Sequence, residues 1–570
     1  MPASTGALSR GILNRDLKVG VISTVLAQWV KINLAHAGSV SARYHDGTRY
    51  GRGEVGELIL IECQQSIILA RLSEVRLPDM ERSELPQDFE GAGNIDAIGQ
   101  AQLLGSIDIG NLRLQAGIKV YPRLGDRVYS APSEFLALLP QLLNGDVDAE
   151  VQNGIDLGYV GGDTNSLLTV LPERLFGRHC AVLGATGGGK SWTTARLVEQ
   201  CAKFPRAKVV LVDATGEYRN LSSDFTTHYH LGDPTHKGQD SAPLGIPSTD
   251  FTETDFLSIF EPSGKVQGPK LREAMKSLRL SKLDPVSFPE GIVRKRNQPK
   301  TLYRRSIRAE NRSALVDKPS QPFDVTKLML QIVEECCWDN GDAWGGENSD
   351  ISYCSSLLTR IQAIIHSTAY QDVFGVQEGR VTLTDALAGF IDGDKQVFRL
   401  CLSDVSYEFY AREVLANVIG RKLMDFARSE MFLTKPLIVF LDEAHNFLGK
   451  RIGGEEHASK LNSFEMIAKE GRKYGLNICL ATQRPRDITE GVLSQMGTLL
   501  VHRLTNERDR EVVEKACGEI DKTAAAFLPN LKQGEIALVG VDFPIPMTVQ
   551  VIEPVFKPRS DSPSYQKYWA

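Results

Sequence analysis

The sequence predicts an α/β protein with a core built on a mainly parallel sheet, preceded by a small β-barrel and interrupted by a helical insertion. Three observations predict this arrangement. A glycine-rich loop over 184–191 lies between an apolar run and a segment with helical spacing, the apolar run 437–441 ends in two carboxylates, and short apolar runs separated by Gly, Asp and Pro fill residues 21–138. Apolar runs alternating with helical segments are typical of a parallel sheet, whereas closely spaced short strands are typical of a barrel.

The glycine-rich loop has the pattern and surroundings of a phosphate-binding loop. Glycines let backbone N–H groups turn towards β- and γ-phosphates at a helix N-terminus, Lys190 can reach the same oxygens, and the Ser191 hydroxyl can bind Mg²⁺. The alternative is a plain glycine-rich turn between a strand and a helix. The predicted nucleotide-binding residues are Gly184, Ala185, Thr186, Gly187, Gly188, Gly189, Lys190, Ser191 and Trp192.

Two carboxylates, Asp442 and Glu443, follow the apolar run 437–441. A carboxylate at the end of a buried strand can hold the Mg²⁺ shell, so Asp442 is the predicted metal-binding partner of Ser191. Glu443 is placed to orient or deprotonate an attacking water, a role for which a small-molecule kinase has less need. The alternative is a carboxylate pair that only caps the following turn.

Two further strand ends carry polar residues. Gln483 ends the strand predicted over 477–483, and its amide could touch the γ-phosphate and report its loss, although a strand-end Gln is usually just solvated. Asp213 ends another apolar run and, with Glu217, lies where a second strand end would face the nucleotide. Either carboxylate could act near the water or Mg²⁺, or could be a turn carboxylate on solvent.

Composition indicates a large globular subunit of two or three domains, with 570 residues, 42% hydrophobic and 24% charged. We expect a cytoplasmic protein, because no apolar run approaches the roughly 20 residues of a membrane span and no signal-peptide pattern is present. Nine cysteines without a C-x-x-C pattern predict buried free thiols. A net charge of −6 means that any grip on DNA needs locally concentrated positive charge, as on the lining of a ring's pore.

Changes of pattern along the chain predict five regions. They are 1–150 (β-barrel), 151–250 (first part of the core), 251–395 (helical insertion), 396–556 (second part of the core) and 557–570 (C-terminal tail). Apolar residues recur every three or four positions at 324–335 and 353–365, which predicts helices in the insertion. In the second part of the core we expect a strand from Gln396 and an amphipathic helix over 407–428.

Three polar segments keep two interpretations each. A basic run from Arg294 to Arg312, with Tyr303 inside, is either a DNA or partner contact or a solvated loop. The exposed loop 449–460 either projects into a pore or is simply flexible. The tail aromatics Tyr565, Tyr568 and Trp569 either dock on a neighbouring subunit or lie in a disordered end.

Taken together, these motifs resemble those of bacterial HerA-type hexameric DNA translocases, P-loop ATPases related to FtsK and to the conjugation ATPases. The resemblance spans most of the chain and rests on the phosphate loop, the 213–218 turn, LDEAHNF at 441–447, the stretch 470–475 and ATQRP at 481–485. It departs at Gly188, where such proteins often have Ser. It implies a RecA-like core with an additional strand between the phosphate-loop strand and the acidic strand, and a barrel like that of rotary ATP synthase subunits.

The resemblance also implies that a neighbouring subunit supplies an arginine to the γ-phosphate, a contact worth about 10³- to 10⁵-fold in rate. Arg178 and Arg472 are the better candidates for this arginine, and Arg503 is the third. Each could equally be a surface ion-pair partner.

The function implied by the resemblance is ATP-driven movement of duplex DNA through a homohexameric ring, with ATP and Mg²⁺ as cofactors and hydrolysis between subunits. HerA-type translocases work with nucleases such as NurA, and some pair with sirtuin-like or nuclease effectors in antiviral defence, so such an effector is the expected protein partner. Two other classes stay open. One is an ATP-binding ring scaffold that assembles and activates an effector without moving on DNA, and the other, a distant third, is a metabolic kinase.

Overall fold

The fold is described from a computed structural model of the chain, which divides into two compact units. The first unit comprises Met1–Gln200, Gln483–Arg486 and Leu493–Val555, and the second comprises Cys201–Thr482, Asp487–Val492 and Phe556–Ala570. Within them the structure describes residues 13–34, 43–45, 48–51, 53–77, 97–109, 114–132, 135–136, 139, 142, 154–160, 167–232, 240–318, 321–367, 370–374, 380–448, 451–452, 459–516, 527–559, 565 and 569.

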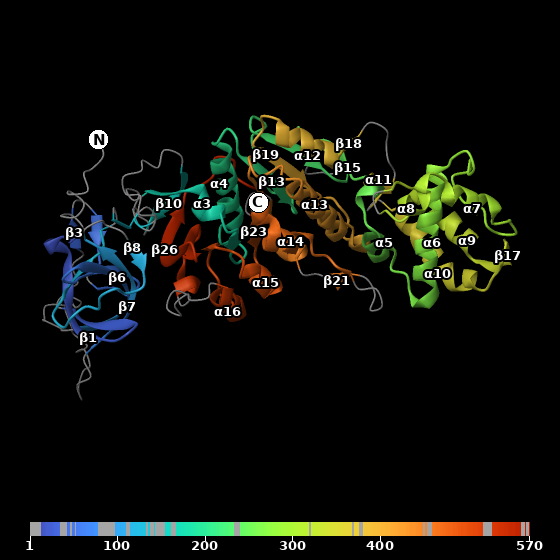
Figure 1. The fold of residues 1–570 in the computed structure, drawn as a ribbon. Coiled ribbons are helices and arrows are strands. Elements are labelled where there is room, and N and C mark those ends of the chain that lie inside the picture. Colours follow the sequence, from blue (N-terminus) through green and yellow to red (C-terminus); the bar gives the residue numbers. More distant parts are fainter. Residues whose placement is uncertain are drawn as a thin grey trace. The chain divides into compact units, whose positions relative to one another are not determined.

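The first unit begins with an antiparallel β-barrel (Figure 1). Its strands run in the order β2-β1-β9-β5-β6-β7, and pairing of β2 with β7 closes the barrel, while β8 adds to β7. The barrel that the sequence predicts is therefore confirmed. The strands are β1 (Lys18–Val25), β2 (Trp29–Leu34), β5 (Leu58–Glu62), β6 (Ser66–Arg76), β7 (Ala97–Asp108), β8 (Leu114–Ala116) and β9 (Arg127–Ser130).

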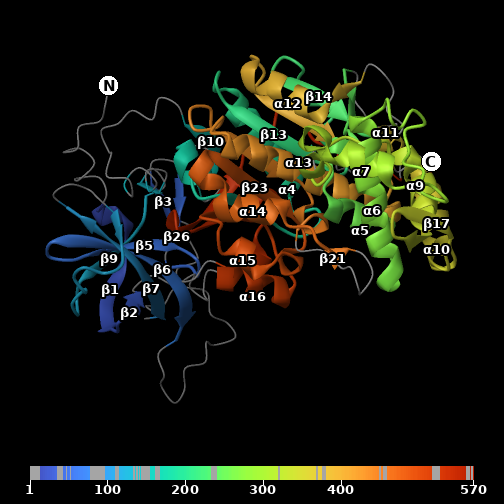
Figure 2. The same ribbon diagram turned by 45° about the vertical axis from the view of Figure 1, so that its right-hand side comes forward.

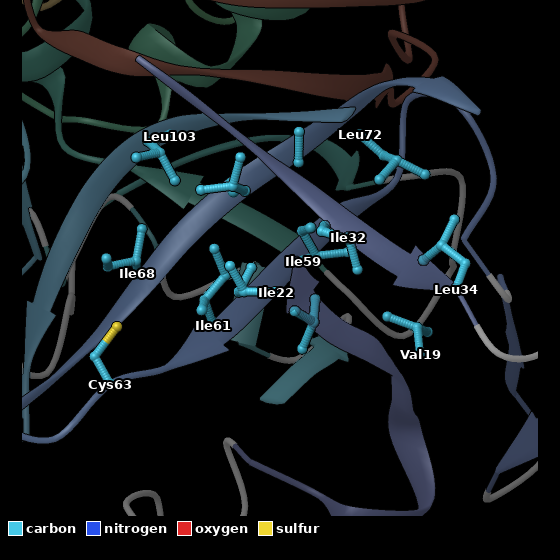
Figure 3. Close-up of a cluster of buried hydrophobic side chains, with 14 of the residues drawn as sticks. Val19, Ile22, Ile32, Leu34, Ile59, Ile61, Cys63, Ile68, Leu72 and Leu103 are labelled. Carbon is cyan, nitrogen blue, oxygen red and sulfur yellow. The ribbon is translucent and has the colours of Figure 1, made fainter. Parts of the chain in front are cut away.

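The barrel interior is filled by aliphatic side chains from alternate strand positions. In β2 burial alternates with partial exposure along the strand, because successive side chains point to opposite faces of a sheet. Figure 3 shows side chains such as Ile32, Ile59, Ile61 and Ile68 converging in this core. Burial raises the pKa of the Cys63 thiol at the edge of the same cluster to about 12, with a contribution from the charge of Asp126.

A second group of strands in the first unit forms part of the core sheet, in the order β11-β10-β26-β25-β24-β12. Only β12 and β24 are parallel, and the other pairs are antiparallel. The elements are β10 (Ile155–Val160), β11 (Leu167–Val170), β12 (Cys180–Leu183), β24 (Thr498–Val501), β25 (Glu535–Gly540), β26 (Phe543–Val551) and the helices α3 (Pro172–Phe176), α4 (Lys190–Ala202) and α16 (Glu507–Ala516).

The second unit holds the mainly parallel part of the core. Its strands follow the order β23-β20-β13-β19-β14-β15-β18, and every pairing within this group is parallel. Strands β13 and β19 are buried along their whole length, which explains their unbroken apolar runs. The strands are β13 (Lys208–Asp213), β14 (Thr226–His230), β15 (Ala242–Gly245), β18 (Val381–Thr382), β19 (Val397–Cys401), β20 (Leu437–Leu441) and β23 (Leu476–Thr482).

Helices pack on these parallel strands, and α14 contacts both α13 and β23 (Figure 2). They are α12 (Leu383–Asp392), α13 (Ala411–Arg428) and α14 (Ser463–Glu470). The helix expected over 407–428 begins later than predicted, at Ala411. Its start is delayed because Phe409 and Tyr410 take left-handed backbone conformations, with φ of 53° and 54°, which a regular α-helix excludes.

Between β15 and β18 the chain forms a helical subdomain (Figure 1). Aromatic rings pack together near its base, among them Phe251, Phe256, Phe260 and Phe374. A two-stranded hairpin interrupts the helices, and the last residues of the range predicted as an insertion, 381–392, lie on the parallel sheet. The elements are α5 (Glu253–Phe260), α6 (Gly264–Leu283), α7 (Thr301–Arg308), α8 (Arg312–Leu315), α9 (Leu328–Glu335), β16 (Cys337–Asn340), β17 (Ala343–Glu347), α10 (Asp350–Ile365) and α11 (Gln371–Phe374).

The C-terminal segment returns to the second unit. The Arg559 N–H donates to the Glu217 carbonyl at 2.9 Å, and Asn220 Nδ2 donates to the Lys557 carbonyl at 3.2 Å. Tyr565 and Trp569 pack ring to ring, whereas Tyr568 and most of the loop 449–460 lie outside the described residues. Among the helices in the described part of the chain, none combines the length and apolarity needed to span a bilayer.

Candidate nucleotide site

The phosphate loop connects β12 to α4. Gly187 and Gly189 have φ of 77° and 105°, so a side chain at either position would be strained. The Gly188 N–H donates to the Ala185 carbonyl at 3.1 Å, and the Thr193 N–H donates to the Gly189 carbonyl at 3.0 Å, which starts the helix. A loop of this shape ahead of a 13-residue helix offers backbone N–H groups to an anion, so these residues fit a bound phosphate chain.

The loop lies on backbone groups from the segments that follow β24 and precede β25. The Ala185 N–H donates to the Arg503 carbonyl and the Gly534 N–H donates to the Gly188 carbonyl, both at 3.1 Å. A Cβ on Gly184 would stand 2.5 Å from the Cβ of His502, so the first glycine of the loop is needed for close packing. Sequence reasoning missed His502, since the sequence does not show which strand lies beside β12.

Gln483 contacts the phosphate loop directly. The Thr186 hydroxyl donates to Gln483 Oε1 at 2.5 Å. The structure therefore brings the strand-end amide and a loop residue together. Lys190 is 7% exposed, and Ser191 and Trp192, which follow it in α4, are partly buried.

In the second unit, Asp442 and Glu443 follow β20. Asp442 is 1% exposed and accepts hydrogen bonds from the hydroxyls of Thr215, at 3.4 Å, and Tyr218, at 3.5 Å. Glu443 takes a left-handed conformation with φ of 45°, which costs a residue with a side chain roughly 1–2 kcal/mol. Strain of this kind concentrates at functional sites.

His445 lies beside Glu443. Its Nδ1 lies 3.2 Å from Glu443 Oε2 and 3.1 Å from the Thr482 hydroxyl, and its side chain is only 11% exposed. The only signal for this histidine in the sequence is its place two residues after Glu443. The imidazole joins the end of β20 to the end of β23.

Asp213 supports the turn that follows β13. It accepts hydrogen bonds from the N–H groups of Gly216 at 2.7 Å, Glu217 at 3.2 Å and Tyr218 at 3.1 Å, and it pairs with Arg399 at 2.7 Å. Asp213 and Arg399 are both fully buried, which excludes the alternative that Asp213 is a turn carboxylate on solvent. Asp213 therefore shapes the turn that presents Tyr218 to Asp442.

Burial and the neighbouring Arg399 charge lower the pKa of His228, whose Nε2 lies 3.0 Å from the Leu221 carbonyl. Glu217 is partly buried, and its carbonyl accepts the C-terminal hydrogen bond described above.

The three candidate arginines lie in different settings. Arg178 is half-exposed and its Nε is 3.6 Å from a carboxylate oxygen of Asp542. Arg472 is exposed in the short 3-10 helix Gly471–Tyr474. The Arg503 carbonyl accepts a hydrogen bond from the Ala185 N–H of the phosphate loop, and Arg503 is exposed.

The basic run of the helical subdomain is largely neutralised by acidic residues. Lys295 pairs with Glu335, and both are buried, while Arg312 pairs with Asp284 at 2.6 Å. The other pairs are Arg294 with Glu290 and Glu334, Arg296 with Glu347, Lys300 with Asp339, and Arg304 with Asp342. The run is thus more than a simple solvated loop, because its paired cations join the segment 294–312 to α9, to the β16–β17 hairpin and to the end of α6.

Comparison with known proteins adds the family. The sequence profile of the family described as "Helicase HerA, central domain" matches residues 155–321. The DNA double-strand break repair helicase HerA of Pyrococcus furiosus is 26% identical over 474 residues, which cover 80% of this chain and 78% of that protein. A probable helicase of Methanocaldococcus jannaschii is 22% identical over 504 residues, covering 86% of this chain and 83% of that protein.

Solved structures with partial similarity include the conjugative coupling protein TrwB in its sulphate complex, at 14% identity and a TM-score of 0.44, covering 71% of this chain and 91% of that one. VirB4 of Thermoanaerobacter pseudethanolicus is also 14% identical with a TM-score of 0.44, covering 73% of this chain and 98% of that one.

The glycine-rich loop ahead of α4 and the parallel strands that end in Asp213 and in Asp442-Glu443 define a P-loop ATPase with a RecA-like core. β23, which pairs with β20, is the additional strand of this class. Together with the profile match and the HerA relatives, these features support a HerA-type ATPase of the FtsK–HerA superfamily, an enzyme of the helicase type.

Proposed function

We propose that the chain is the subunit of a ring-forming motor that hydrolyses ATP between subunits and moves duplex DNA. The observation that carries this proposal is the similarity, over 80% of the chain, to a protein named a DNA double-strand break repair helicase. A homohexamer is the proposed state, and a nuclease or sirtuin-like effector, in DNA-end processing or antiviral defence, is the proposed partner.

The site residues divide the work of hydrolysis. The loop amides and Lys190 bind the phosphates, and Ser191 and Asp442 hold Mg²⁺, which supplies charge neutralisation at the phosphate oxygens when bound. Glu443, whose Oε2 lies 3.2 Å from His445 Nδ1, orients and deprotonates the attacking water. Gln483, bonded to Thr186, responds to the γ-phosphate through the loop itself.

An arginine from the neighbouring subunit completes the proposed site. Arg472 is the best candidate because it is exposed, whereas Arg178 has Asp542 as a neighbour and the Arg503 carbonyl already accepts a hydrogen bond from the phosphate loop of its own subunit. Mixing Arg472→Ala subunits with Glu443→Gln subunits tests the assignment, since some interfaces of the mixed ring then carry both intact groups. We expect partial recovery of ATPase activity, and mixed rings with no recovery would remove Arg472 as the trans arginine.

The central test is whether DNA stimulates hydrolysis. We expect duplex DNA to raise kcat for ATP in the wild type but not in Glu443→Gln, and we expect the protein to displace a bound third strand from a duplex in an ATP-dependent way. Hydrolysis that ignores DNA and no displacement would reject the motor.

A ring scaffold that assembles an effector without moving on DNA is the second candidate. The specific observation in its favour is the internal neutralisation of the basic run, together with the net charge of −6. A scaffold would show ATPase activity that does not change with DNA but rises when a copurifying protein is added. Transfer of phosphate to a small acceptor, with little release to water, would instead indicate the kinase.

A further inference from the structure

His502 lies directly beneath the phosphate loop. It follows β24, and its backbone N–H donates to the Leu183 carbonyl at 2.7 Å, which keeps the end of β24 level with the start of the loop. The residue is fully buried. A Cβ on Gly184 would stand 2.5 Å from its Cβ, and one on Gly189 would stand 3.4 Å from its Cε1. The imidazole therefore packs against both ends of the loop.

The same imidazole is bonded to the helix that the loop begins. His502 Nε2 and the Thr193 hydroxyl lie 2.9 Å apart, and both residues are buried. Thr193 is in the first turn of α4, where its N–H donates to the Gly189 carbonyl at 3.0 Å. A single side chain thus links β24 to the loop and to the helix N-terminus that presents amides to an anion.

The imidazole can do this without adding charge. Burial, and secondly the Lys190 ammonium, lower the pKa of His502 to about 3. The ring is therefore neutral at ordinary pH, so it does not repel Lys190. The loop's attraction for phosphate then comes from Lys190, the amides and the start of α4.

We propose that His502 is a positioning residue that holds the phosphate loop in its anion-binding conformation through the Thr193 hydroxyl. The proposal rests on the assignment of the loop as the ATP site. Because the loop holds nucleotide in the ground state and the transition state alike, loss of this support weakens MgATP binding more than it lowers kcat.

The experiment measures the Kd of MgATP by fluorescence titration in the full chain, with kcat at saturating ATP and Tm. His502→Leu keeps bulk but leaves the buried Thr193 hydroxyl without its partner, so we expect Kd to rise about 10-fold. Thr193→Val should raise Kd similarly, and the double variant should be no weaker than either single one, since both remove the same bond. His502→Gln, which can still reach the hydroxyl, should recover most of the affinity.

A matched control separates positioning from simple packing. His230 on β14 is also buried, with Nδ1 2.8 Å from the Ser241 hydroxyl, so His230→Leu removes a comparable bond outside the loop. We expect it to lower Tm and leave the MgATP Kd unchanged. If His502→Leu also lowers only Tm, or if the Gln and Leu variants bind MgATP equally, the positioning role is overturned. A wild type that binds no MgATP would instead reject the proposed ATPase function.

Discussion

The phosphate loop and the acidic strand ends are supported by different kinds of interaction. In the first unit, backbone hydrogen bonds from Arg503 and Gly534 and the neutral imidazole of His502 support the loop. In the second unit, the turn behind Asp442 depends on the buried ion pair between Asp213 and Arg399.

The difference follows from what each part must bind. A loop that binds a polyanion needs its positive charge for the ligand. Uncharged supporting groups do not neutralise that charge. The charge of Asp213 is not needed for a ligand. Arg399 compensates this charge within the core. Asp442 then accepts hydrogen bonds from the hydroxyls of Thr215 and Tyr218, which orient its side chain.

The largest expected effect is on kcat, and it should distinguish residues that act in hydrolysis from residues that bind MgATP. Glu443→Gln replaces the carboxylate by an amide that cannot accept the proton of the attacking water, so we expect kcat to fall by about 10²- to 10⁴-fold while MgATP still binds. Lys190→Ala should instead lose MgATP binding. Steady-state ATPase assays and nucleotide titrations check both, and a Glu443→Gln enzyme with normal kcat would contradict the assignment.

Removing one partner of the buried Asp213–Arg399 ion pair should have the largest effect on stability. Asp213→Asn leaves the Arg399 guanidinium uncompensated in the core, so we expect the free energy of unfolding to fall by roughly 3–5 kcal/mol in urea denaturation. The double variant Asp213→Leu/Arg399→Met should recover much of this loss, because it buries no charge. A double variant as unstable as the single one would show that the hydrogen bonds to the 216–218 turn, not the charge, dominate.

The uncharged imidazole of His502 should affect how the free energy of unfolding depends on pH. The pKa of His502 is about 3 in the fold, below its ordinary value of 6.5, so the unfolded chain binds the proton more tightly. Its contribution to stability is present above pH 6.5 and is lost as pH falls from 6.5 towards 3. Between pH 7 and pH 5 we therefore expect the free energy of unfolding to fall by about 2 kcal/mol more in the wild type than in His502→Gln, as measured by denaturation at each pH. Equal pH profiles would contradict a neutral His502.

Most of the fold and the site motifs follow from local sequence patterns. The apolar runs of β13 and β20, the glycines of the loop and the alternation in the barrel are set by residues close together in the chain. The roles of His502, Arg399 and Tyr218 depend instead on which strands lie side by side. The sequence does not display strand order, so these supports could not be predicted. The acidic partners of the basic run could not be predicted for the same reason, since Glu334 and Glu335, which pair with Arg294 and Lys295, lie on α9.

The smallest effects are expected in the helical subdomain, where a third kind of support can be compared with the first two. Arg304 and Asp342 form an exposed pair, so Arg304→Ala should change the free energy of unfolding by less than about 1 kcal/mol. Arg312 and Asp284 are both mostly buried, so Arg312→Ala should cost more.

Neither change should alter DNA binding, because each cation already has an acidic partner. The salt dependence of duplex affinity is the sharper measurement, since every lost phosphate contact lowers its slope by about 0.9. Among the described residues no acidic partner is seen for Arg305 or Arg308, which are exposed on α7, and the variant Arg305→Ala/Arg308→Ala is the matched comparison. An unchanged slope with Arg304→Ala and with Arg312→Ala is the expected result. A lower slope in the Arg305→Ala/Arg308→Ala variant alone would instead assign DNA contact to these two arginines, while a lower slope with Arg304→Ala would show that its ion pair opens to bind phosphate.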